Sequence, residues 1–216
     1  MRKYLSYTLN RDTPTYGNRN RFQIIRNSDI SKGDIANDSS ISTTLHIGTH
    51  IDMPFHFYQD GQTVEDFDID FWYFNNPLFL EIEPRDLIIY DEVVEQLEKL
   101  ENIGQDILII KTGICDIRDS EKFWRENYGF SPNLYDYLIK KFPEIRVIGF
   151  DSISISSFQN REEGREAHRR FLNPKRPILI LEDMDLREVK ILKRVQIVPL
   201  RVSNSDGLPC TVIAEW

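Results

Sequence analysis

The chain is poor in the residues that would place it in several common protein classes. It has two cysteines among 216 residues, Cys115 and Cys210, and these lie far apart. Two distant cysteines form neither a disulfide framework nor a cysteine-rich metal cluster. No apolar stretch approaches the length of a transmembrane helix, and the first eight residues lack the apolar run of a signal peptide. We therefore expect a single cytoplasmic domain that spans residues 1–216.

Positive charge is scarcer than negative charge. The chain carries 27 Lys and Arg against 35 Asp and Glu, which gives a formal net charge of −8. A surface of this sign repels nucleic acids and anionic lipids. We therefore expect a small-molecule substrate, and neither a nucleic-acid partner nor a membrane partner.

The motifs of several catalytic classes are also missing. The sequence has no G-x-S-x-G elbow, no P-loop and no G-x-G-x-x-G fingerprint. Cys115 is a conceivable nucleophile, but a small packed side chain is the simpler interpretation of a single cysteine. These absences leave metal-assisted chemistry to be considered.

Histidine is rare, but three of the four histidines fall within the eleven residues 46–56, His-Ile-Gly-Thr-His-Ile-Asp-Met-Pro-Phe-His. Alternate side chains of an extended chain point to opposite faces. One face of this segment is therefore apolar, and the other presents His46, His50, Asp52 and His56. Imidazoles and a carboxylate are the ligands of a divalent metal site. The alternative is a half-buried strand with core histidines, but burying so many titratable groups without a counter-ion is costly.

A metal site requires this segment to bend. A straight strand from His46 to Asp52 would span roughly 20 Å, whereas the ligands of one metal all approach it to about 2.0–2.2 Å. Gly48 supplies backbone freedom on the ligand side, and Pro54 fixes the backbone just after Asp52. We expect the chain to turn around the metal at these positions.

Two further candidates lie in the second half of the chain. His168 lies among charged residues and, taken alone, is typical of a surface helix. Glu182 ends the apolar run 178–181, where a carboxylate is either solvated or acts as a bridge between two metal ions. Because neighbours in a strand point to opposite faces, only one of Glu182 and Asp183 can face the site. We favour Glu182.

Hydrophobic patterning predicts a mixed α/β protein. Strands dominate the first half, and strands alternate with helices in the second half, which places the site near strand ends. A helix is expected from an N-cap at Asp91 to Gly104, and another from Ser131-Pro132. A third is expected around 162–172. The expected strands are 22–25, 41–45, 78–82, 107–111, 147–150, 177–181, 195–200 and 211–214.

The motif H-x-G-T-H-x-D-x-P-x-H resembles the signature of the cyclase-like metal-dependent hydrolases, a family that includes bacterial kynurenine formamidases and isatin hydrolases. The likeness extends along most of the chain. It includes the turn Gly61-Gln62-Thr63-Val64, the pair Thr112-Gly113, the segment Gly149-Phe150-Asp151-Ser152, and the turn Asp206-Gly207-Leu208-Pro209. The resemblance implies a swivelling β/β/α domain with a mixed sheet or barrel core and peripheral helices. It also implies a homodimer or a larger homo-oligomer.

The resemblance also implies roles for single residues. His46 and His50 would bind a first metal ion, and His168 would bind a second. Asp52 and Glu182 would bridge the two divalent ions, which are zinc or manganese in such proteins. His56 would be the catalytic acid/base.

The sequence differs from the formamidases at Pro14-Thr15-Tyr16-Gly17, which stands where they have an aromatic-Pro-Gly segment. Tyr16 is therefore a candidate substrate contact, and we expect substrate choice to differ as well.

The expected function is metal-dependent hydrolysis of an amide, lactam or ester bond in a small molecule. A metal-activated water would be the nucleophile, and His56 would pass a proton to the leaving group. An arylformamide is the first substrate to consider, and an isatin-like cyclic amide is the second. Two alternatives remain: a metal-dependent cyclase or lyase, and a metal-binding protein without catalytic activity.

Overall fold

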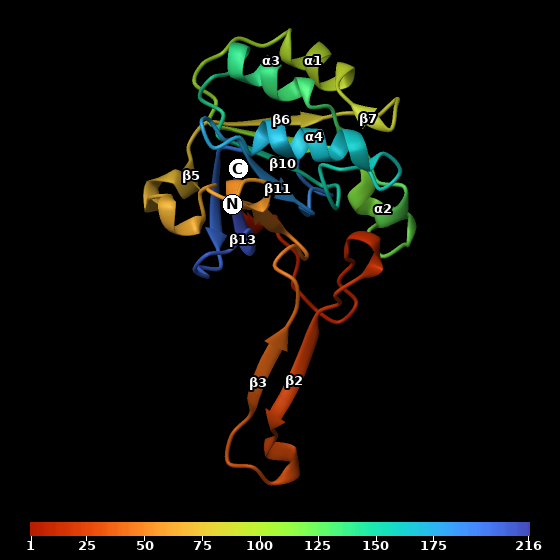
Figure 1. Cartoon of the computed structure of the whole chain (residues 1–216), viewed down its shortest axis with the longest axis vertical. Helices are drawn as coiled ribbons and strands as arrows, with labels where there is room; N and C mark the ends of the chain where they lie inside the picture. Colours follow the sequence, from red (N-terminus) through yellow and green to blue (C-terminus); the bar gives the residue numbers. More distant parts are fainter.

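The computed structural model describes all residues from 1 to 216 and is built around one nine-stranded mixed sheet (Figure 1). In spatial order the strands are β5 (Tyr73–Phe74), β12 (Arg194–Pro199), β13 (Gly207–Glu215), β4 (His50–Asp52), β11 (Leu179–Glu182), β10 (Val147–Phe150), β8 (Ile107–Lys111) and β6 (Pro77–Glu81). The ninth strand, β1 (Arg2–Tyr4), pairs with β13 outside this order. A separate short pair is formed by β7 (Ile88–Ile89) and β9 (Gly129–Phe130).

The short strand β4 lies where the two halves of the sheet meet. On one side, β11, β10, β8 and β6 run parallel to one another. On the other side, β13, β12 and β5 are antiparallel. Strand β4 is antiparallel to both of its neighbours, and Asp52 pairs with Ile180 of β11 and Gly207 of β13. His50 and Asp52 of the histidine motif therefore lie at the centre of the sheet.

The sheet curls toward a barrel because its two edges are joined closely along the chain. Edge strand β5 ends at Phe74 and the opposite edge strand β6 begins at Pro77, so that Asn75 and Asn76 are the whole connection. The carboxylate of Asp106 accepts hydrogen bonds from the backbone N–H groups of Asn75 at 2.8 Å and Asn76 at 3.2 Å. A curved mixed sheet with peripheral helices is the architecture expected from the sequence, and the fold class is confirmed.

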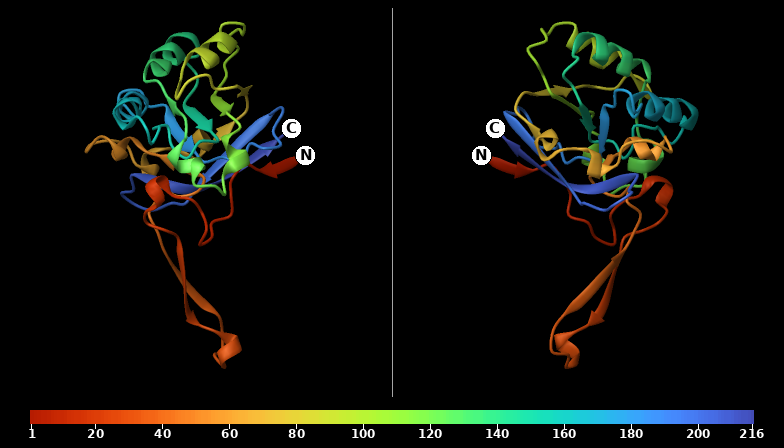
Figure 2. Two further views of the ribbon diagram at one scale, coloured as in Figure 1. Left: turned by 90° about the vertical axis from the view of Figure 1, so that its right-hand side faces the viewer. Right: turned by 60° about the vertical axis from the view of Figure 1, so that its left-hand side comes forward.

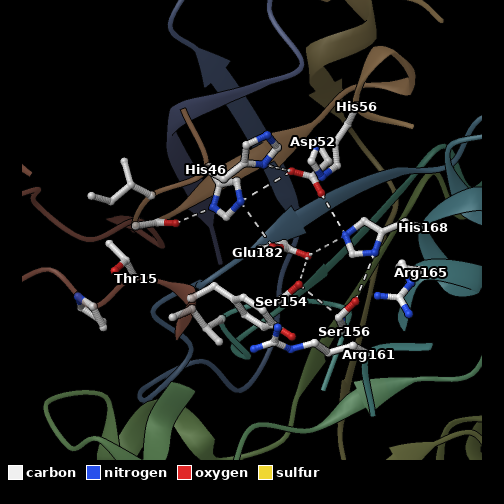
Figure 3. Close-up of a pocket in the computed structure, with 16 residues that line it drawn as sticks. Thr15, His46, Asp52, His56, Ser154, Ser156, Arg161, Arg165, His168 and Glu182 are labelled. Carbon is white, nitrogen blue, oxygen red and sulfur yellow. Dashed lines mark hydrogen bonds and ion pairs between the residues drawn. The ribbon is translucent and has the colours of Figure 1, made fainter. Parts of the chain in front are cut away.

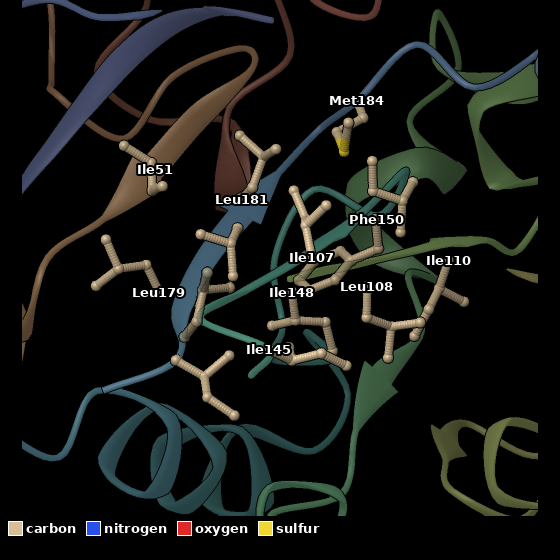
Figure 4. Packing of buried hydrophobic residues seen from close by; sticks show 14 of the residues in the cluster. Ile51, Ile107, Leu108, Ile110, Ile145, Ile148, Phe150, Leu179, Leu181 and Met184 are labelled. Atoms are coloured by element: carbon tan, nitrogen blue, oxygen red, sulfur yellow. The ribbon is translucent and has the colours of Figure 1, made fainter. Parts of the chain in front are cut away.

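Helices cover the parallel half of the sheet (Figure 1). They are α1 (Asp91–Leu97), α3 (Asn133–Lys141) and α4 (Arg161–Phe171), and the one-turn helix α2 (Lys122–Arg125) lies apart from them. Strands β8, β10 and β11 are almost entirely buried, as expected for parallel strands with both faces covered. Their aliphatic side chains are the centre of a core of 40 buried apolar residues (Figure 4). This core gives the site a rigid base.

Several element boundaries differ from the sequence prediction. Helix α1 ends at Leu97 rather than near Gly104, because the chain tightens there: Leu100 N–H bonds to the carbonyl of Leu97 rather than four residues back. Asp91 is the first helical residue and Tyr90 the N-cap. Helix α3 begins at Asn133, one residue later than expected. The strand predicted over 41–45 is instead β3 (Asp38–Ser42).

Strands β2 (Gln23–Ser28) and β3 form a hairpin that projects from the body of the molecule (Figures 1 and 2). We call residues 23–42 the arm. All of its strand residues are exposed except the half-buried Ser28. Its apolar side chains lie in solvent, including Ile25 at 48% exposure and Ile41 at 60%. No helix of the structure is long and apolar enough to cross a membrane.

Candidate metal centre and pocket

The histidine segment bends where the sequence predicted a bend. Only His50–Asp52 is a strand, and Gly48 adopts a positive φ of 57°, which glycine accepts without strain. The bend turns His46 back toward Asp52, so that His46 Nδ1 lies 2.8 Å from Asp52 Oδ1. Pro54 then opens a short 3-10 turn that ends at His56.

Asp52 lies at the centre of the resulting cluster (Figure 3). Its side chain is 1% exposed, and it is approached by His46, by His50 Nε2 at 3.5 Å and by His168 Nε2 at 3.4 Å. His168 comes from α4, more than a hundred residues later in the chain. Taken alone, the sequence around His168 is typical of a surface helix. In the structure His168 is instead buried beside Asp52, at 6% exposure.

The backbone fixes the orientation of two imidazoles. His50 Nδ1 lies 2.8 Å from the carbonyl oxygen of Gly48, and His168 Nδ1 lies 2.8 Å from that of Gly164. A carbonyl only accepts, so each Nδ1 carries its proton and each Nε2 is left for a ligand. Metal-binding histidines are usually held in this way.

Glu182 and Asp183 point in different directions. Glu182 Oε2 lies 3.3 Å from His50 Nε2, and Glu182 Oε1 accepts a 2.7 Å hydrogen bond from the backbone N–H of Ile155. Asp183 instead accepts two hydrogen bonds from Arg118, at 2.7 and 2.6 Å. Of the two neighbours, the structure brings Glu182 to the cluster.

The side chains in the cluster fit a divalent metal. The buried atoms His50 Nε2 and Asp52 Oδ2 make no well-formed hydrogen bond, although Glu182 Oε2 lies 3.3 Å from the first and His168 Nε2 lies 3.4 Å from the second. Such an arrangement is costly unless a cation binds these atoms. Two sets of ligand atoms lie close enough together to hold an ion. One set is His50, Asp52 and Glu182, and the other is His46, Asp52 and His56. Asp52 belongs to both sets, as a bridging carboxylate would. The second set groups His56, rather than His50, with His46.

Asp206 is a member of the cluster that the sequence did not single out as a site residue. Its Oδ2 lies 2.9 Å from His46 Nε2 and 3.3 Å from His56 Nδ1. A side chain would not fit at the neighbouring Gly207, because a Cβ there would lie 2.5 Å from His46 Cε1. In the sequence, the turn Asp206-Gly207-Leu208-Pro209 forms part of the family resemblance and nothing more. The contact of Asp206 with His46 spans 160 residues, so no local sequence pattern predicts it.

Without a cation, the carboxylates of the cluster hold protons on the imidazoles. Burial opposes a charge on His46, but Asp52 and Asp206 outweigh it and raise the pKa of His46 to about 10. Burial is likewise outweighed by Glu182 at His50 and by Asp52 at His168, and both pKa values are raised. Protons and a metal ion would therefore compete for the same nitrogen atoms.

The cluster opens into a cavity of about 370 Å³. Tyr16, the candidate substrate contact, lines this cavity, and its hydroxyl donates to the carbonyl oxygen of Ser157 at 3.4 Å. Burial raises the pKa of Tyr16, so the hydroxyl stays protonated. Two arginines that the sequence did not single out, Arg161 and Arg165, also line the cavity (Figure 3). Cys115 is buried outside this cavity, and burial raises the pKa of its thiol, which fits a packing role.

Comparison with known proteins identifies the family. The sequence profile of the family described as "Putative cyclase" matches residues 4–157, well over half of the chain. The chain belongs to the cyclase family. Cyclase-like protein 1 of Arabidopsis thaliana is 30% identical to it over 190 residues, which cover 85% of this chain and 71% of that protein. The resemblance to the family seen in the histidine motif is thereby confirmed.

One further relative and one solved structure match nearly the whole chain. The kynurenine formamidase of Bacillus cytotoxicus is 27% identical over 210 residues, which cover 97% of this chain and 94% of that enzyme. Isatin hydrolase A from Labrenzia aggregata superposes with a TM-score of 0.80 at 19% identity, covering 99% of this chain and 93% of its own. The second likeness establishes a shared fold across the entire chain.

Proposed function

We propose that this cyclase-family protein is a metal-dependent hydrolase that cleaves an amide, lactam or ester bond of a small molecule. The observation that carries the proposal is the cluster around the buried Asp52, which belongs to both ligand sets, lies 3.4 Å from His168 Nε2 and lines a cavity. The likeness to a kynurenine formamidase over 97% of the chain supports an amide bond as the target. An arylformamide is the first substrate to test, and an isatin-like cyclic amide is the second.

Five side chains would hold the metal. His46, His50 and His168 would donate imidazole nitrogens, and Asp52 and Glu182 would donate carboxylate oxygens and bridge two ions. Imidazole and carboxylate ligands together suit zinc and manganese. When bound, divalent cations acidify water and polarise a carbonyl oxygen.

His56 would move the proton that the reaction requires. Asp206 lies beside Nδ1 of this imidazole, and hydrogen bonds with His46 and His56 hold the pKa of Asp206 below its usual range, so that it stays an acceptor. With the proton of the neutral imidazole on Nδ1, Nε2 carries the lone pair. It can take a proton from the attacking water and give it to the leaving nitrogen. Asp206 is thus a positioning residue in this scheme.

Hydrolysis is tested by product analysis in water enriched in oxygen-18. The metal-loaded protein is incubated with formanilide and, separately, with isatin, and the masses of the products are measured by mass spectrometry. We expect one solvent oxygen in the new carboxylate. The family description favours a cyclase or lyase as the alternative, and a product without solvent oxygen would establish that class instead. A protein that binds metal and turns over neither substrate would leave metal binding as its function.

We further propose that the protein is a homodimer or a larger homo-oligomer, paired through the arm. An isolated two-stranded hairpin is marginally stable in water, and the apolar side chains of this one are exposed. A second copy that covers Ile25 and Ile41 would stabilise it. Light scattering should give at least twice the chain mass of 25.5 kDa, and the double variant Ile25→Lys, Ile41→Lys should shift the protein to the monomer. A monomeric wild-type protein would refute this assembly.

A further inference from the structure

The cavity has a basic wall that the proposed metal ligands do not use. Arg161, Arg165 and His168 all line the cavity and all come from α4. Their spacing of four and three residues places them on one face of the helix. At 1.5 Å of rise per residue, Arg165 and Arg161 lie about 4.5 and 10.5 Å from His168 along the helix axis. The two guanidinium groups therefore face the same space as the metal ligand.

Helix α4 carries two other arginines, and these behave differently. Arg169 lies 3.7 Å from the carboxylate of Glu166, and Arg170 lies 3.0 Å from that of Asp136. Neither Arg161 nor Arg165 makes an ion pair, although the protein has eight more acidic than basic side chains. Two like charges four residues apart also weaken a helix. Both residues are exposed, so their charges are solvated, and no carboxylate of the protein competes with a bound anion for them.

Aromatic rings orient one of the two guanidinium groups. Arg161 Cζ lies 4.2 Å from the ring centroid of Phe158 and 5.8 Å from that of Tyr16. A guanidinium stacked in this way keeps its N–H edge free, and that edge matches the two oxygens of a carboxylate. Arg161 thus lies within reach of the Tyr16 hydroxyl, and no carboxylate of the protein pairs with its guanidinium.

We propose that Arg161 and Arg165 form a carboxylate-binding subsite, and that the substrate is a small molecule with a carboxylate group near the bond that is cleaved. The proposal rests on the hydrolase function above and names its substrate class. The carboxylate would lie against α4, about one to two helical turns from His168, while the scissile carbonyl lies at the histidine cluster. A neutral analogue would lose these contacts and keep the rest.

Binding to the metal-loaded protein tests the subsite without turnover. The probes are 2-aminobenzoate and its neutral counterpart aniline, compared by titration calorimetry. Charge-assisted hydrogen bonds predict that 2-aminobenzoate binds at least about 10-fold more tightly than aniline. Arg161→Gln and Arg165→Gln should each remove most of this preference, and Arg165→Lys should restore part of it. The matched variants Arg169→Gln and Arg170→Gln, on the same helix, should keep it. A preference that is unchanged in Arg161→Gln and Arg165→Gln would overturn the subsite.

Kinetics separate a failure of the subsite from a failure of the hydrolase. We expect 2-formamidobenzoate to have a KM at least about 10-fold below that of formanilide, and Arg165→Gln to remove the difference. Hydrolysis of both compounds with equal KM, unaffected by either arginine, would refute the subsite and leave the hydrolase standing. Arginine-dependent binding of 2-aminobenzoate with no hydrolysis of either compound would support the subsite and refute the hydrolase.

Discussion

Neutral substitutions of the neighbouring carboxylates Glu182 and Asp183 should have different effects. The first should lower metal affinity, and the second should lower the stability of the fold. In Glu182→Gln the side chain keeps its shape, and its amide oxygen can still accept the 2.7 Å hydrogen bond from the backbone N–H of Ile155. The fold should therefore be retained. The metal should not, because Glu182 would be a direct ligand, and loss even of an indirect partner lowers metal affinity 10- to 100-fold. We expect metal affinity to fall at least about 100-fold.

Asp183→Asn should keep the metal and lose stability. Asp183 has a positive φ of 52°, which asparagine tolerates, so the backbone is not strained by this change. The variant removes one partner of a buried ion pair, whose side chains are 1% exposed at Asp183 and 11% at Arg118. Leaving the other charge buried and unpaired typically costs about 3–5 kcal/mol. We expect a decrease of about that size in the free energy of unfolding.

The two variants are compared by metal analysis after dialysis and by urea unfolding of the metal-free proteins. The expected result is a crossed pattern: Glu182→Gln is stable and metal-poor, whereas Asp183→Asn is metal-loaded and unstable. If Glu182→Gln retained full metal while Asp183→Asn lost it, the assignment of the inward carboxylate would be wrong.

Three other predictions concern the histidines. His56→Ala should keep its metal and lose about 10²- to 10⁴-fold in turnover, the usual contribution of a general acid/base; loss of metal would instead make His56 a ligand with His46 and Asp52. Gly207→Ala should lower metal affinity, because the new Cβ would push His46 from its place, and unchanged affinity would contradict that geometry. Zinc binding at pH 7 should release at least one proton per chain, because the raised pKa of about 10 at His46 keeps that imidazole protonated until a cation displaces the proton; calorimetric enthalpies that do not vary with the buffer would refute this.

Much of the fold can be predicted from the sequence because the local hydrophobic patterns agree with the packing. Strands β8 and β10 were predicted to the residue, since short apolar runs bounded by turns suit buried parallel strands. The end of α1 cannot be predicted in this way. Leu100 continues the helical spacing, but this residue is 42% exposed and its packing stabilises the helix little. The end of β3 also differs from the prediction: the strand stops at Ser42 rather than at residue 45, because Ser42 pairs with Gln23, the first residue of β2.

The site likewise has features that the sequence predicts and features that it does not. The bend at Gly48 followed from the spacing of the histidine motif and the reach of a metal ion. Asp206 could not be found from its surroundings, because its contact with His46 depends on how β13 pairs with β4. The arginines of α4 look alike in the sequence, and only the packed structure separates the pair that lines the cavity from the pair held by Glu166 and Asp136.

Anomalous diffraction from crystals grown with zinc or manganese would show whether Asp52 bridges a two-metal centre. We expect two peaks about 3.5–4 Å apart, one on each side of the Asp52 carboxylate, with His168 and Glu182 in contact. Metal analysis of the same protein should give up to two ions per chain. A map with no peak in the histidine cluster, or with a single peak that Asp52 does not touch, would contradict the bridging role of Asp52.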